Sequence, residues 1–71
     1  MIYYFVAYYG PEKAYTYNIE KNMWLPYSPI YRKRYYDYEI AIQAAKRARK
    51  KNPDKRKDIF IDTAQCYIRE V

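Results

Sequence analysis

The sequence predicts a small single-domain α+β fold with the element order β-β-α-β, in which one helix packs on one face of a three-stranded antiparallel sheet. Three observations predict this fold: a stretch in which apolar and polar residues alternate, a stretch with apolar residues at helical spacing, and glycine or proline between the elements. A chain of 71 residues is too short to bury two separate cores. We therefore expect one domain over residues 1–71.

The first strand is expected at residues 1–9. This run is apolar on both faces, which places the strand in the middle of the sheet. Gly10 and Pro11 follow it, and they favour a turn because glycine can take a positive φ and proline cannot continue a strand ladder.

The second strand is expected at residues 14–24, where alternation predicts one buried and one solvated face. Tyr15, Tyr17, Ile19 and Met23 would share the buried face. Joined to the first strand by the turn, it would form an antiparallel hairpin. Residues 25–36 contain Pro26 and Pro29, so we expect a loop there, and its length marks it as a candidate functional loop.

The helix is expected at residues 38–51, with Asp37 as its N-cap and with Asn52 and Pro53 ending it. The final strand is expected at residues 58–70, although the segment from Asp62 to Gln65 also matches a capping box that could open a short helix. The predicted core consists of Tyr15, Tyr17, Ile19, Ile40, Ala41, Ala44, Ala45, Ala48, Ile59 and Ile61.

Basic residues are concentrated in two stretches of a chain whose net charge is +6. The stretch 46–57 has one acidic residue, Asp54, and eight basic ones: Lys46, Arg47, Arg49, Lys50, Lys51, Lys55, Arg56 and Lys57. The helix dipole accounts for two or three cations near a helix C-terminus. It does not account for eight, and we interpret them as a surface that binds a phosphate backbone.

The second basic stretch lies in the loop, where Arg32, Lys33 and Arg34 stand between aromatic residues. The candidate aromatic contacts are Trp24, Tyr27, Tyr31 and Tyr35. Rings can stack on unpaired bases while the cations hold phosphates. The alternative is that the tyrosines seal the sheet and the arginines lie along their faces.

Catalysis is not expected, and neither is a cofactor or a bound metal. The chain has no histidine, one glycine and one cysteine, Cys66, so the usual zinc sites, phosphate-binding loops and Cys–His pairs cannot be built. The chain is similar in charge and tyrosine content to ribosome-dependent mRNA interferases, which cleave RNA without histidine. It is shorter than they are, and its order of elements differs.

The leading hypothesis is a basic, non-catalytic protein that binds DNA or RNA in the cytoplasm. The alternative is a viral or plasmid-borne effector that inhibits a host complex handling nucleic acid, for example in defence, through Tyr, Trp and Arg hot spots. An interferase-like RNase comes third. A chain this small could also form a homodimer, and no membrane association is expected.

Overall fold

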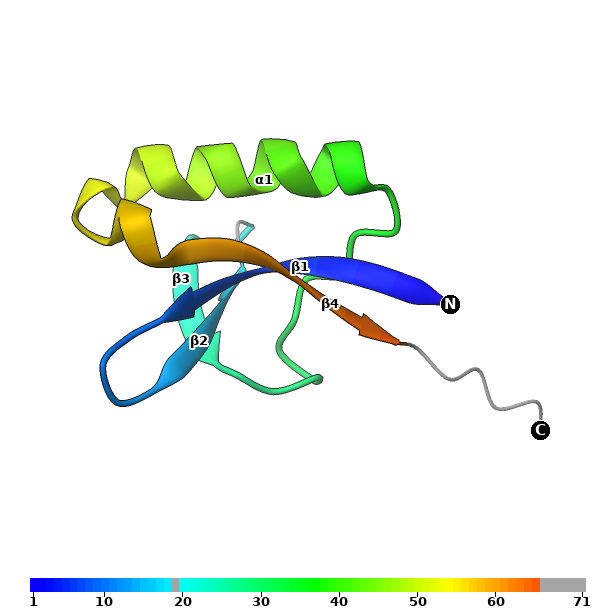
Figure 1. Cartoon of the computed structure of the whole chain (residues 1–71), viewed down its shortest axis with the longest axis horizontal. Coiled ribbons are helices and arrows are strands. Elements are labelled where there is room, and N and C mark those ends of the chain that lie inside the picture. The colour runs from blue at the N-terminus through cyan, green and yellow to red at the C-terminus, as the bar shows by residue number, and fades with distance from the viewer. Residues whose placement is uncertain (19, 66–71) are drawn as a thin grey trace.

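The computed structural model describes residues 1–18 and 20–65 (Figure 1). The elements are β1 (Ile2–Tyr9), β2 (Ala14–Asn18), β3 (Met23–Pro26), α1 (Tyr38–Lys51), the 3₁₀ helix η1 (Pro53–Asp58) and β4 (Ile59–Gln65). The strands form one antiparallel sheet in the order β3-β2-β1-β4, and α1 lies over one face of it. The α+β class, the antiparallel sheet and the central place of β1 are therefore confirmed.

The sheet has four strands rather than the predicted three, because the segment expected as one strand over residues 14–24 turns back on itself. Asn22 has a φ of 49°, in the left-handed region that asparagine adopts more readily than most residues. The side chain of Asn18 accepts a hydrogen bond from the backbone N–H of Lys21 at 3.1 Å and closes the turn. Met23 consequently pairs with Asn18 and lies on the opposite face from the one predicted.

The new strand β3 occupies the edge of the sheet, and this position explains how it contains a proline. Pro26 pairs with Tyr15 at the end of β3, where a missing N–H costs little. The β1–β2 turn is closed by a hydrogen bond from Gly10 N–H to Lys13 O of 2.9 Å. Gly10 does not use a positive φ. A Cβ there would lie 3.1 Å from Lys13 O, so close packing favours glycine at this position.

The helix packs on the sheet through small side chains. Asp37 caps it by accepting a hydrogen bond from Glu39 N–H at 2.9 Å. The buried residues of α1 are the predicted alanines, Ala41, Ala44, Ala45 and Ala48. Ala44, Ala45 and Ala48 pack with Val6, Tyr17 and Ile59 and with the half-buried Trp24, Tyr35 and Ile61.

Two core predictions need correction. Ile40 is 53% exposed, because it lies at the margin of the alanine stripe on α1 and points away from the sheet. Tyr15 is only half-buried. Ile19 lies outside the described residues, as do Cys66 and the last part of the predicted strand 58–70. The strand interpretation of residues 62–65 is confirmed, since β4 continues to Gln65.

The face of the sheet opposite α1 has a second buried cluster. Tyr3, Phe5 and Ala7 of β1 form it, together with Ala64. The loop after β3 runs along this side and returns to the edge of β1, where Tyr35 and Tyr4 exchange backbone hydrogen bonds of 2.7 and 2.8 Å (Figure 1). We call α1 the helix cover of the sheet and residues 27–36 its loop cover. Within residues 1–18 and 20–65, no helix has the length and apolar character needed to cross a membrane.

Candidate nucleic-acid interface

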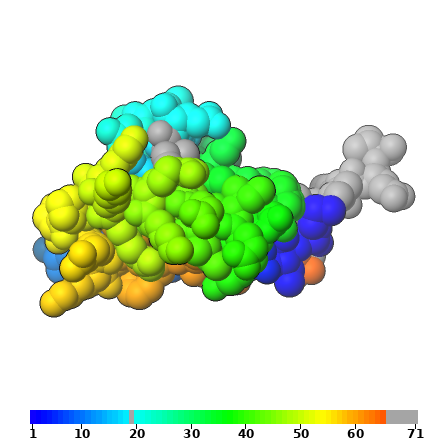
Figure 2. All heavy atoms as spheres, turned by 90° about the horizontal axis from the view of Figure 1, so that it is seen from above, coloured from blue at the N-terminus to red at the C-terminus, as the bar shows by residue number. Residues whose placement is uncertain are grey.

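Six of the eight basic residues predicted between positions 46 and 57 are exposed on the second half of α1 and on η1. They are Lys46, Arg47, Lys50, Lys51, Arg56 and Lys57, and we call this set the cationic ridge. None of them forms an ion pair with a residue in 1–18 or 20–65. Figure 2 views the molecule from the helix side, where α1 and η1 form one continuous surface. The ridge is therefore a cluster of like charges open to solvent.

The turn between α1 and η1 brings Arg56 next to the basic residues near the end of α1. Asn52 ends α1 with its backbone N–H and its side-chain amide both donating to Ala48 O, at 3.0 and 2.8 Å. Pro53 then starts η1. As a result, Lys46, Arg49, Lys50 and Arg56 line a shared hollow of about 410 Å³.

Two predicted residues of this stretch are engaged within the protein. The guanidinium of Arg49 donates to Ile59 O at 2.9 Å and so ties α1 to the start of β4. The ammonium of Lys55 pairs with Asp54 at 2.9 Å and lies 5.7 Å from the centre of the Tyr8 ring. That hydrogen bond lowers the pKa of Asp54 and raises the pKa of Lys55.

Each of the three loop cations has a partner within the protein. The guanidinium carbon of Arg32 lies 4.2 Å from the centre of the Phe5 ring and 4.9 Å from the centre of the Tyr27 ring. The same guanidinium donates a hydrogen bond to the Tyr3 hydroxyl at 3.2 Å. Its buried Nε has no hydrogen-bond partner among the described residues. Arg34 lies 4.8 Å from the centre of the Tyr3 ring.

Lys33 pairs with Glu20 at 2.8 Å. Their hydrogen bond raises the pKa of Lys33 and lowers that of Glu20. All three loop cations are thus engaged within the protein, whereas the cations of the ridge have no ion pair among the described residues. Tyr35 lies near both sets, since the charges of Lys33 and Arg47 each oppose the rise in its pKa that burial causes.

The four candidate aromatic contacts are divided between the two faces of the sheet. Trp24 and Tyr35 are half-buried beside the core under α1. Tyr27 lies on the other face, 5.6 Å from Phe5, and donates to Asp62 at 2.6 Å. Burial raises the pKa values of Tyr27 and Tyr35. Tyr31 is 41% exposed.

A feature that the sequence interpretation missed lies at the end of the β1–β2 hairpin. Tyr8, Tyr15 and Trp24 line a cavity of about 450 Å³ together with Lys13 and Lys55. Tyr8 and Tyr15 stand at equal distances from the turn that joins their strands, and this spacing is a signal that could have indicated their pairing.

Searches for similar proteins give no further indication of function: no family model, curated protein or solved structure matches the chain. Over the described ranges, no group of three or more His, Cys, Asp or Glu side chains gathers in a way that could hold a metal ion. The exposed feature that bears on function is the cationic ridge.

Proposed function

We propose that this protein binds nucleic acid without cleaving it, holding the phosphate backbone along the cationic ridge. The observation that carries the proposal is the set of six exposed cations with no ion pair among the described residues. Like charges held this close repel one another and destabilise the folded state. A polyanion bound along the ridge would remove that repulsion and release its own counterions.

The shape and chemistry of the ridge suit a duplex backbone. Residues 46–51 occupy about 8 Å of helix axis, and duplex DNA carries about one charge per 1.7 Å. Lysine and arginine contacts to phosphates set position but do not read sequence. We therefore expect weak sequence preference. Binding along the ridge needs no proton transfer, so we expect labelled RNA incubated with the protein to be recovered intact, with or without ribosomes. Cleavage that disappeared when Arg or Tyr residues were replaced would favour the interferase alternative instead.

The test is a binding series at several salt concentrations on a blunt-ended duplex. Four to six phosphate contacts predict that log K falls with log salt at a slope of about −3.5 to −5.5. The variant Arg47→Gln/Lys50→Gln should flatten the slope by about 1.8, because it removes two contacts.

Lys21→Gln, an exposed lysine in the β2–β3 turn, serves as the control and should leave the slope close to that of the wild type. A double variant with an unchanged slope would contradict the proposed role of the ridge.

A second candidate function, binding to a protein complex that handles nucleic acid, is favoured by apolar side chains at the start of α1. Tyr38 and Ile40 are 50% and 53% exposed. Aromatic and aliphatic groups of this kind form the centres of protein interfaces. The salt series separates the two functions, because a protein-directed surface would retain no nucleic-acid probe even at low salt.

A further inference from the structure

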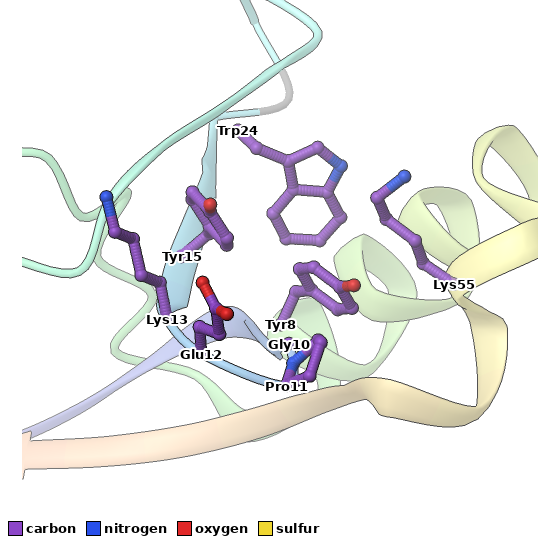
Figure 3. Close-up of a pocket in the computed structure, with 8 residues that line it drawn as sticks. All are labelled: Tyr8, Gly10, Pro11, Glu12, Lys13, Tyr15, Trp24 and Lys55. Atoms are coloured by element: carbon purple, nitrogen blue, oxygen red, sulfur yellow. The ribbon is translucent and has the colours of Figure 1, made fainter.

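The cavity at the end of the β1–β2 hairpin has walls of aromatic rings (Figure 3). Tyr8 and Tyr15 come from paired positions of β1 and β2, and their rings lie 5.8 Å apart with planes only 17° apart. Trp24 of β3 lies 5.5 Å from Tyr8. All three are half-buried. The volume, about 450 Å³, is in the range of small-molecule sites, which is about 300–1,000 Å³.

Trp24 is held in place before any ligand arrives. Its indole N–H donates to the side-chain oxygen of Asn52 at 3.2 Å, and the amide of Asn52 donates to Ala48 O at 2.8 Å. The ring of Tyr17 packs against the indole from the core at 4.7 Å. A ring fixed in this way loses little conformational entropy when a planar group stacks on it.

Charged groups surround the rings. Lys13 and Lys55 stand on opposite sides of the cavity, and the carboxylate of Glu12 rises between them toward Tyr15 (Figure 3). Ammonium groups hold phosphates as point charges, and a carboxylate accepts hydrogen bonds from the amino groups of a base.

The cavity adjoins the cationic ridge across η1. Lys55 lines the cavity, and its neighbour Arg56 lines the hollow shared with Lys46 and Lys50. A strand that follows the ridge can therefore reach the cavity by crossing one short helix.

From these observations we infer that the cavity binds an unpaired nucleobase, stacked on Tyr15 and Trp24, from a strand whose backbone continues onto the ridge. The inference rests on the proposed function for the approach of the strand. Aromatic rings stack on every kind of base, at about 1–3 kcal/mol per base. The site would thus select unpaired positions rather than a sequence.

A cationic ligand such as a methylated ammonium group fits this cavity less well. Aromatic cages attract such cations through the faces of their rings. Here the ammonium of Lys55 already lies 5.7 Å from the centre of the Tyr8 ring, and Lys13 adds a second positive charge. A further cation would compete with Lys55 for the face of the Tyr8 ring, whereas a planar base would stack on Tyr15 and Trp24.

Trp24 is the single tryptophan of the chain, so its fluorescence reports directly on the cavity. The probes are a blunt duplex, the same duplex with a one-nucleotide overhang, and the overhang with an abasic sugar, each made in DNA and in RNA. The natural overhang should quench Trp24 and bind about five-fold or more tightly than the blunt duplex. The abasic overhang should neither quench Trp24 nor bind more tightly than the blunt duplex. Whether the effect is larger with the DNA probes or with the RNA probes shows which nucleic acid supplies the base.

Matched variants locate the effect. Tyr15→Ala and Lys13→Ala should lose the preference for the overhang and keep the affinity for the blunt duplex. Phe60→Ala and Lys21→Ala, which remove an exposed ring on the opposite face of the sheet and an exposed lysine in the β2–β3 turn, should keep both. Lys13 is exposed in a turn, so its variant remains informative even if Tyr15→Ala does not fold.

Equal affinity and equal fluorescence with all three ends would overturn the inference. Salt-dependent binding of the blunt duplex in the same series would still support the ridge. Conversely, quenching by the overhang without binding of the blunt duplex would support the cavity and overturn the ridge.

Discussion

Both covers of the sheet contain basic residues, but they place them differently. The helix cover contacts the sheet through alanines and through Arg49, while Arg47 and the three lysines of α1 project into solvent. The loop cover contacts the sheet through Arg32 and Arg34, which lie on the rings of Phe5 and Tyr3. One basic stretch thereby becomes a charged surface, and the other becomes part of the packing.

The difference comes from periodicity and from the shape of the guanidinium group. A helix separates its faces every 3.6 residues, so alanines and cations interleaved in sequence lie on opposite sides. The loop has no such period, and its arginines present a flat, weakly hydrated group that stacks well on aromatic rings. The number of basic residues in a segment therefore does not indicate how many are available to a partner.

The largest expected effect concerns the contact between the helix cover and the sheet. Ala45 is 1% exposed and packs in the cluster of Val6 and Ile59. Ala45→Asp would bury an unpaired charge and should cost several kcal/mol, a large part of the about 5–15 kcal/mol of a typical domain. Circular dichroism should show loss of structure.

Gln43→Asp, on the exposed side of α1, is the matched control and should fold normally. If both variants were equally folded, the alanine stripe would not be the buried face, and the comparison of the two covers would fail.

An intermediate effect is expected from the loop cover. Arg32→Met removes the hydrogen bond to Tyr3 and the contact with Phe5, and it should lower the free energy of unfolding by about 1–3 kcal/mol. Arg47→Met in the ridge should change it by no more than about 0.5 kcal/mol. Urea denaturation measures both, and equal losses would show that the two sets of cations do not differ in their role in stability.

The smallest expected effect is a loss of stability at alkaline pH. Burial, followed by the hydrogen bond to Asp62, raises the pKa of Tyr9, and burial also raises that of Tyr27. A raised pKa means that the folded protein holds these protons more tightly than the unfolded chain, whose tyrosines titrate at about 10. The stability that these two phenols contribute is therefore fully present below a pH of about 10. It is lost as the pH rises through their pKa values in the folded protein.

Thermal melts between pH 8 and 11 test this effect. The melting temperature of the wild type should fall above a pH of about 10. Tyr9→Phe/Tyr27→Phe should start less stable and decline less over the same interval, since it lacks both phenols. Parallel curves for the two proteins would place the alkaline loss elsewhere in the molecule.

The parts of the fold that could be predicted are those that local chemistry determines. Asp37, the spacing of the alanines and Asn52–Pro53 define the helix and its buried face without reference to the rest of the chain. The exposure of Lys46, Arg47 and Lys50 follows from the same helical phase.

What could not be predicted depends on turns without a strong signal and on the path of the chain. The β2–β3 turn has no glycine or proline, and its reversal depends on the left-handed φ of Asn22. Trp24 lies beside Tyr8 only because β3 folds back onto β2. The cavity that these residues line could therefore not be predicted from the sequence. The burial of Arg32 follows from the route of the loop over Phe5, which sequence spacing does not encode.

The pairing of β1 with β4 also has a consequence for how the chain folds. The central strand meets its neighbour across almost the whole sequence, from Ile2 opposite Gln65 to Tyr8 opposite Ile59. Contacts between such distant positions close large loops and slow the search for the native state. During synthesis the apolar β1 leaves the ribosome before β4 and keeps one edge unpaired until β4 follows. An unpaired apolar edge favours aggregation, so we expect aggregation to be promoted in the interval before β4 emerges.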